Sequence, residues 1–377
     1  MASFFVALHV SLLVSWLIVR VSRAYRLPWE DRQLVGVQKF HAASVPRVGG
    51  IGVFLGLAGL ASWVLATRTG PGTELSLILS CGLPPLVVGL LEDITKQVGV
   101  KTRLLATALS GVLAFHFLDA ELRSVQIPGL DWLMTFTWFS MLFTVVAVAG
   151  VANAVNIIDG YNGLAAVVVI IALLSLAYVG LQVGDNLVVS MALGGAGALL
   201  GFLVWNWPRG LIFLGDGGAY FIGYLVAVLS LLLVVRNRGV VSPWYPFLLF
   251  IYPVFETLFS VWRKWMVRGG SPGVPDGLHL HMLVFRRLVR WAVGRRDAAS
   301  LTLRNSLTAP YLWMLSSVAA VPATLFWRHP QVLQACVAVF CLLYIWLYLR
   351  LVRFRAPRWM VISSPRARRP APPPAKH

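Results

Sequence analysis

Long apolar stretches are the feature that most limits what this chain can fold into. About eleven separate stretches of roughly 17 to 22 residues are each long enough to cross a hydrocarbon core about 30 Å thick as a helix. Only 12% of the 377 residues are charged, which excludes a soluble globular fold. Because the stretches lack the alternation of a membrane barrel, the sequence predicts an all-α polytopic membrane protein. We expect spans at 3–19, 49–66, 74–91, 104–119, 132–152, 163–180, 187–205, 218–235, 244–262, 306–327 and 331–349.

The distribution of Lys and Arg predicts the orientation. With the N-terminus outside, 27 of the 32 basic residues fall on inner loops and the tail. Cytoplasmic loops carry an excess of Lys and Arg, so we expect the N-terminus outside and the C-terminus in the cytoplasm. The formal charge of +18 then lies mainly on the cytoplasmic face, where it attracts anionic lipids or substrates. Topology explains this charge, so we expect no nucleic-acid partner.

We expect one transmembrane domain at 1–352 and a basic, Pro-rich cytoplasmic tail at 353–377 that is disordered. The expected cytoplasmic loops are 20–48, 92–103, 153–162, 206–217 and 263–304. Cys81, Cys336 and Cys341 all lie in apolar stretches, so they indicate neither a disulfide framework nor a thiolate metal site.

Polar motifs gather at the cytoplasmic ends of the expected spans. Four short segments contain them: Gly89–Asp93, Asn153–Gly160, Phe213–Gly218 and Pro275–His281. Each alone has an ordinary explanation, as a solvated span end, a turn or a surface histidine. Gathered on one face, carboxylates repel one another unless a cation lies among them, and hard oxygen ligands select Mg²⁺ or Mn²⁺. The sequence therefore predicts a divalent ion and a phosphate substrate.

Glu256 lies inside the ninth expected span, where a charge is costly and a functional or partnered role is the default. A transporter would place several such groups near the middle of the membrane. The other carboxylates lie at the interface instead, which favours chemistry at the membrane surface over transport.

From about Lys39 to His281, the chain resembles the polyprenyl-phosphate N-acetylhexosamine-1-phosphate transferases. This multi-span family includes enzymes that start O-antigen and teichoic acid synthesis, and the phospho-N-acetylmuramoyl-pentapeptide transferase. Each matching motif is weak alone, but the ordered set is specific: Lys39–His41, Pro46–Gly50, Glu92–Asp93 with Lys101 and Arg103, Asn153–Leu164, Phe213–Gly218, Pro253–Leu258 and Ser271–His281.

The resemblance implies transfer of a sugar-1-phosphate from a UDP-sugar to a polyprenyl phosphate such as undecaprenyl phosphate, with release of UMP. It implies a bacterial inner-membrane enzyme with its active site facing the cytoplasm, which starts a lipid-linked cell-envelope glycan such as the O-antigen of lipopolysaccharide. The sugar, the polymer and whether the chain forms a homodimer stay open.

The resemblance also implies roles by position. Mg²⁺, or Mn²⁺, would be held by Asp216 and Asp93. Catalytic roles would fall to Glu92, Asp93, Lys101, Asp159, His279 and His281. Substrate contacts would come from Arg47, Lys101, Arg103, Asn153, Asn156, Asp159 and Phe213, with Phe213 packing on uracil. Phosphoryl transfer needs charge neutralisation more than covalent chemistry, which suits this set.

The chain departs from the family pattern at Glu92, Asn162, Ala219, Gly277 and Met282. The usual residues are Asp, Asp, Ser, Arg and His. These changes indicate a specialised branch and argue against the pentapeptide transferase. They leave two alternatives open, a family member that has lost activity and a transporter or flippase for a lipid-linked sugar.

Overall fold

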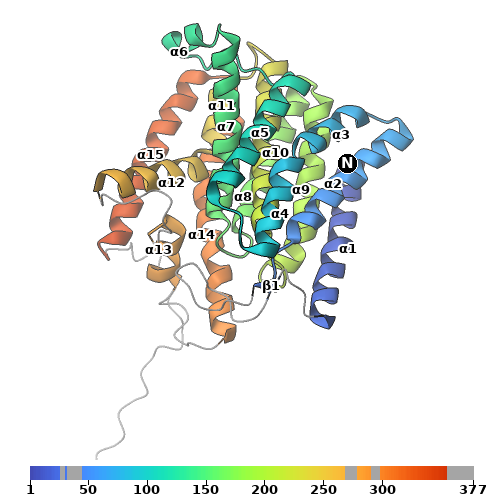
Figure 1. The fold of residues 1–377 in the computed structure, drawn as a ribbon. Coiled ribbons are helices and arrows are strands. Elements are labelled where there is room, and N and C mark those ends of the chain that lie inside the picture. Colours follow the sequence, from blue (N-terminus) through green and yellow to red (C-terminus); the bar gives the residue numbers. More distant parts are fainter. Residues whose placement is uncertain (26–29, 32–44, 268–277, 290–297, 355–377) are drawn as a thin grey trace, which may run out of the picture.

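The structure is a computed structural model that describes residues 1–25, 30–31, 45–267, 278–289 and 298–354 (Figure 1). Two-residue strands, β1 (Glu30–Asp31) and β2 (Val45–Pro46), pair antiparallel. The helices are α1 (Ala2–Ala24), α2 (Gly49–Thr67), α3 (Gly72–Cys81), α4 (Leu83–Thr95), α5 (Val100–Phe117), α6 (Pro128–Leu133), α7 (Thr137–Ile158), α8 (Leu164–Val183), α9 (Asn186–Asn206), α10 (Gly215–Arg236), α11 (Trp244–Leu249), α12 (Ile251–Trp262), the π-helix Arg263–Val267, α13 (Leu280–Arg287), α14 (Ala298–Leu325) and α15 (Pro330–Val352).

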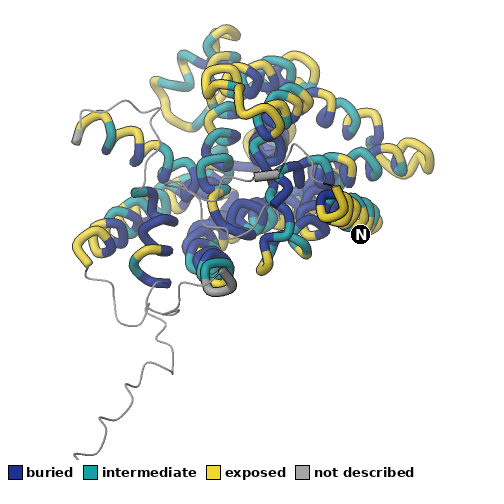
Figure 2. Tube along the Cα trace, turned by 60° about the horizontal axis from the view of Figure 1, so that its bottom comes forward, coloured by how far each residue is buried: buried dark blue, intermediate teal, exposed yellow. Residues whose placement is uncertain are grey.

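Helix α10 forms the centre of the bundle and contacts α2, α4, α5, α7, α8 and α9. It is buried on all sides from Gly217 to Val234, as expected of a helix that is apolar all round. The outer helices expose one side, and Figure 2 shows buried segments in the middle with exposed ones around them. Exposed apolar residues such as Leu105, Leu142 and Leu342 suit a lipid-facing surface.

The prediction of an all-α polytopic membrane protein is confirmed. Among the described residues, seven helices are long and apolar enough to cross a membrane, and the bent pair α3 and α4 raises this to eight. The expected total of about eleven spans and their orientation stay predictions. The bend between α3 and α4 is 45°. Its cause is Pro84 and Pro85, which have no N–H to donate to the carbonyls of the preceding turn.

The expected span 244–262 is not one continuous helix. It breaks at Phe250 into α11 and α12, and α12 lies across the long helices in Figure 1. Pro253 explains the break, because it cannot donate a hydrogen bond to the carbonyl of Leu249. The break brings Glu256 onto a short helix that crosses the bundle.

Helices continue into the segments expected as cytoplasmic loops, and at two of them this affects expected site residues. Helix α7 continues to Ile158, so Asn153 and Asn156 lie on a helix and not in a loop at 153–162. Helix α4 continues to Thr95, so Glu92 and Asp93 are also helical. Apolar windows end where polar residues begin, but a helix continues until its backbone pattern is interrupted. The tail from 355, the segment 268–277 and most of the loop 20–48 lie outside the described residues.

A cysteine-accessibility experiment tests the orientation. Gly99 precedes α5 and Gly129 lies in α6, at opposite ends of the bundle, and neither has a neighbour that a new side chain would strike. In a background with the three native cysteines replaced by alanine, we expect Gly129→Cys to react with an impermeant thiol reagent on intact cells. Gly99→Cys should react only after the membrane is opened. The reverse pattern would place the polar end of the bundle outside the cell.

Candidate functional site

Glycines allow three helices to meet at one end of the bundle. A Cβ on Gly50 of α2 would overlap the backbone of Gly218 in α10. A Cβ on Gly89 of α4 would overlap the backbone of Gly217. Small residues of this kind let helix backbones approach closely in a membrane, where packing replaces the hydrophobic driving force. The first turn of α10 is therefore pressed between α2 and α4.

The chain before α10 is tied to the chain before α2 by backbone hydrogen bonds. Phe213 N–H donates to the Pro46 carbonyl at 2.8 Å, and its carbonyl accepts from Gly49 N–H at 2.9 Å. Gly215 follows with φ of +76°, and a Cβ there would overlap the carbonyl oxygen of Arg47. Only glycine fits this left-handed turn. The turn fixes Arg47 beside Asp216.

Two carboxylates and two guanidinium groups make up the centre of the site. Arg47 Nε lies 3.5 Å from Asp93 Oδ1, and Arg47 Nη2 lies 3.7 Å from Asp216 Oδ1. Arg103, from the first turn of α5, forms an ion pair with Asp216 Oδ2. Asp93 is 1% exposed and accepts a hydrogen bond from Gly217 N–H at 3.0 Å, so it also caps the start of α10. Its Oδ1 is buried without a hydrogen-bond donor among the described residues.

Helix α7 places amides beside these charges. Asn156 Nδ2 donates to Asp216 Oδ1 at 3.3 Å. Asn153 lies one turn earlier and accepts a hydrogen bond from the Tyr220 hydroxyl at 3.5 Å, while the Tyr220 ring lies 6.0 Å below the Arg103 guanidinium carbon. The spacing of three residues puts both amides on one face of α7.

Asp159 directly follows α7, and its surroundings raise its pKa. Removal from water raises its pKa to about 7; the Arg47 guanidinium opposes the rise, and the carboxylates of Asp216 and Asp93 add to it. Burial is therefore the main reason that this pKa is raised. The loop after Asp159 leads to the histidines, because the Tyr161 ring packs edge-on against His281 at 5.6 Å.

The histidines are buried and parallel. The rings of His279 and His281 stack with centroids 5.2 Å apart and an interplanar angle of 5°. His279 Nδ1 lies 2.9 Å from Glu256 Oε1. The sequence predicts a functional or partnered role for Glu256, and in the structure its partner is His279.

Most residues expected at the site gather there, but three lie at its edge or beyond it. Glu92 Oε2 accepts from Val98 N–H at 2.7 Å, so this carboxylate closes the turn between α4 and α5. Lys101 is exposed on the first turn of α5, and the half-buried Phe213 contributes its backbone to the turn before α10. The roles expected for these residues stay predictions.

Asn162, one of the departures from the family pattern, belongs to a buried hydrogen-bond network with α14. Its N–H donates to Asn305 Oδ1 at 2.8 Å, and its amide Nδ2 donates to Ser306 Oγ at 3.2 Å and to the Pro208 carbonyl at 3.5 Å. An amide supplies donors to these oxygens, whereas a carboxylate would only accept. Here Asn162 holds the loop after α7 against α14.

The structure adds residues that the sequence did not single out. Tyr220 touches both Asn153 and Arg103, and its position one turn after Asp216 was the available signal. Tyr344, on α15, donates to Glu256 Oε2 at 2.7 Å. It lies far beyond the resembling region in an ordinary apolar stretch, so nothing in the sequence pointed to it.

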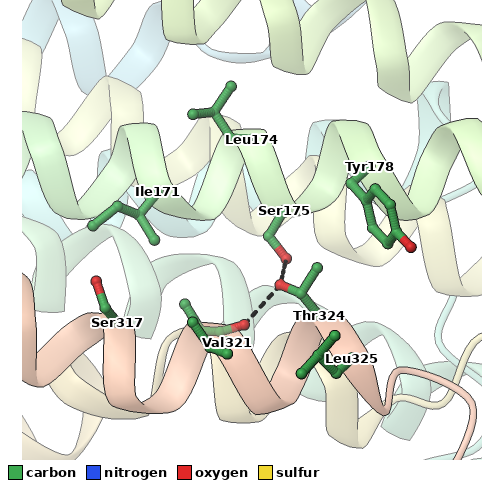
Figure 3. A pocket seen from close by; sticks show the side chains of 9 residues that line it. Ile171, Leu174, Ser175, Tyr178, Ser317, Val321, Thr324 and Leu325 are labelled. Atoms are coloured by element: carbon green, nitrogen blue, oxygen red, sulfur yellow. Dashed lines mark hydrogen bonds between the residues drawn. The ribbon is translucent and has the colours of Figure 1, made fainter.

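A hollow lies between α8 and α14, away from the charged site (Figure 3). Apolar side chains such as Ile171, Leu174 and Val321 line most of it, and the Ser175 and Thr324 hydroxyls meet across it at 2.6 Å. No residue expected at the site lines this hollow.

The fold and the site together define a polytopic membrane protein with a cluster of paired charged groups at one end of its bundle. Comparison with known proteins names the family. The model of glycosyl transferase family 4 matches residues 75–234. The chain is 30% identical over 321 residues to the decaprenyl-phosphate N-acetylglucosaminephosphotransferase of Mycolicibacterium smegmatis, an alignment that covers 77% of this chain and 74% of that protein. The chain belongs to glycosyl transferase family 4.

Two further relatives show the breadth of the family. The probable undecaprenyl-phosphate N-acetylglucosaminyl 1-phosphate transferase of Bacillus subtilis is 28% identical over 291 residues, covering 77% of this chain and 78% of that protein. The phospho-N-acetylmuramoyl-pentapeptide-transferase of Moorella thermoacetica is 29% identical over 201 residues, covering 50% and 62%. The resemblance seen in the sequence is thereby confirmed.

A glycine substitution tests the helix contact beneath the site. We expect Gly89→Ala to destabilise the protein by about 1–3 kcal/mol, because the new methyl group meets the backbone of α10. Gly150→Ala is the matched control, since nothing lies within 4 Å of a Cβ there. Thermal unfolding in detergent measures both. An equal melting temperature for the two variants would mean that α4 and α10 do not meet through Gly89.

Proposed function

We propose that this protein transfers an N-acetylhexosamine-1-phosphate from a UDP-sugar to a polyprenyl phosphate and releases UMP, at the cytoplasmic face of a bacterial inner membrane. The observation that carries the proposal is the meeting of Arg47, Arg103, Asp93 and Asp216 at the glycine contact of α2, α4 and α10. The relatives' names add the polyprenyl-phosphate acceptor and the N-acetylglucosamine-1-phosphate donor group.

The residues of the site suit a reaction between phosphates. The acceptor phosphate already carries its nucleophilic oxygen as an anion, so placement and charge neutralisation matter more than a strong base. Arg47 and Arg103 would bind phosphate oxygens, and the amides of Asn153 and Asn156 would orient the nucleotide sugar. The buried histidines would contact the diphosphate from the side of Asp159.

The donor set also fits a magnesium ion. Among the described residues, no three His, Cys, Asp or Glu side chains group as a complete metal site. Magnesium in phosphate-transferring sites is usually held by one or two carboxylates together with substrate phosphates and water. Asp93, whose Oδ1 accepts no hydrogen bond from the described residues, and Asp216 would supply these carboxylates. The ion would neutralise charge on the transferred phosphate.

The experiment that tests the proposal measures UMP. Purified protein in detergent receives Mg²⁺, undecaprenyl phosphate and one UDP-N-acetylhexosamine at a time, and UMP and the mass of the lipid product are recorded. We expect one UDP-sugar to give equimolar UMP and glycosyl-diphospho-lipid. Absence of UMP with every sugar would contradict the proposal and leave a lapsed family member or a transporter.

Substitutions of single carboxylates test which of them take part in the reaction. We expect Asp216→Asn and Asp93→Asn each to lower the rate of UMP release by about a hundredfold or more, because each removes a charge that faces the phosphates. Glu92→Gln should stay within about tenfold of wild type, because the amide oxygen still accepts from Val98 N–H. Asp131→Asn, at the other end of the bundle, is the control for purification. Equal and mild effects at Asp93 and Glu92 would mean that neither carboxylate of α4 takes part in the reaction.

Proton release tests whether a cation binds beside Asp159. The pKa of about 7 means that this carboxyl group is about half protonated at pH 7, and a nearby cation would favour its ionised form. Addition of Mg²⁺ should therefore release protons, most strongly near pH 7 and less at pH 5.5 or 8.5. Asp159→Asn should reduce this release, because it removes one of the carboxyl groups that the cation would deprotonate. A release that is the same in wild type and variant would place the ion elsewhere.

A further inference from the structure

The segment that carries His279 is held at two points by one helix and its continuation. Glu256 Oε1, on α12, accepts from His279 Nδ1 at 2.9 Å and from Leu280 N–H at 3.0 Å. Arg263 follows α12 directly, and its Nη1 donates to the Leu278 carbonyl at 3.1 Å. The two residues are seven apart, about two helical turns, so both face the same segment.

Helix α15 supports each of these two residues with a tyrosine. The Tyr344 hydroxyl donates to Glu256 Oε2 at 2.7 Å. The Tyr348 hydroxyl accepts from Arg263 Nη1 at 2.6 Å, and the Arg263 guanidinium lies 5.2 Å from the centre of the Tyr348 ring. Their spacing of four residues places both tyrosines on one face of α15. All four side chains are buried, with exposed fractions from 0% to 6%.

These contacts fix the orientation of an imidazole. An ionised carboxylate only accepts hydrogen bonds, so we assign the proton of His279 to Nδ1, which leaves Nε2 available to a ligand. The parallel stack then aligns His281 with His279, and His281 packs against Tyr161 next to Asp159. A buried acid and a buried arginine are costly unless they are well hydrogen-bonded, and α15 supplies a hydrogen-bond partner to each.

We propose that Glu256, Arg263, Tyr344 and Tyr348 form a clamp that positions His279 for the transfer reaction, with the two tyrosines of α15 as positioning residues. The inference rests on the proposed function, and it extends the site to a helix outside the region matched by the family model, residues 75–234. Among metal-binding histidines, loss of the group that supports the ring lowers metal affinity or activity about 10- to 100-fold, which gives an upper range for the effect expected here.

The test compares two buried tyrosines that each lose one hydroxyl. Tyr344→Phe keeps the ring that packs against Phe255 and removes only the bond to Glu256. Tyr245→Phe is the matched control, because this equally buried residue bonds Ser175 at 2.8 Å on another helix. Two quantities are measured for each: kcat and KM for UMP release, and the rate at which diethyl pyrocarbonate modifies His279, read by mass spectrometry without substrate.

We expect Tyr344→Phe to lower kcat about tenfold with KM changed less than about threefold, and to speed modification of His279 several-fold. Tyr245→Phe should leave kcat and modification unchanged. Tyr348→Phe provides a second variant should Tyr344→Phe not survive purification. If both α15 variants match Tyr245→Phe in kcat and in modification, the clamp is wrong. If wild type releases no UMP, the proposed function fails, while the modification rates still test the clamp.

Discussion

Three helix segments approach one another through glycines at the polar end of the bundle, and the positions of the reactive groups depend on this contact. Side chains at Gly50, Gly89 or Gly217 would separate α2, α4 and α10. With the backbones in contact, Asp93 reaches the first turn of α10 and caps it, and Asp216 on that turn faces the arginines. Packing of apolar helices alone would form a bundle. The close approach of α2, α4 and α10 also brings their charged residues together at one end of it.

At this end of the bundle, arginines neutralise the aspartates, and both could exchange these partners for a ligand. Arg47 lies between Asp93 and Asp216, and Arg103 of α5 pairs with Asp216. Under the proposed function, phosphates would draw the arginines and a cation would take their place beside the carboxylates. Groups that neutralise one another before substrate arrives avoid the cost of isolated charges at the edge of a membrane.

Much of the fold could be predicted from the sequence, because a hydrocarbon solvent forces long apolar stretches into helices. Convergence of the polar motifs at one end of the bundle also followed from the ends of those stretches. The kinks did not, because hydropathy averages over a window and a single residue such as Pro253 redirects a helix. For the same reason the sequence placed Asn153 and Asn156 in a loop, although α7 continues past them.

Side-chain partners were harder to predict. Glu92 and Asp93 are adjacent acids, but one closes a turn and the other caps α10, a difference set by which side of α4 faces the bundle. The role of Tyr344 could not be predicted, because tyrosines are common in apolar stretches and only the fold brings Tyr344 beside Glu256. The pairing of Asn162 with Asn305 and Ser306 required knowledge of the packing of α14.

Under the proposed function, the glycine contact creates a site for a cation and phosphates between Asp93 and Asp216. Manganese provides the most direct measurement, because Mn²⁺ takes the same oxygen ligands as Mg²⁺ and scatters X-rays anomalously. Crystals grown with Mn²⁺ and a UDP-sugar should give an anomalous peak beside Asp93 and Asp216, with Arg47 and Arg103 turned to the phosphates. An anomalous peak elsewhere, with both arginines still paired to these carboxylates, would mean that Asp93 and Asp216 do not hold the cation.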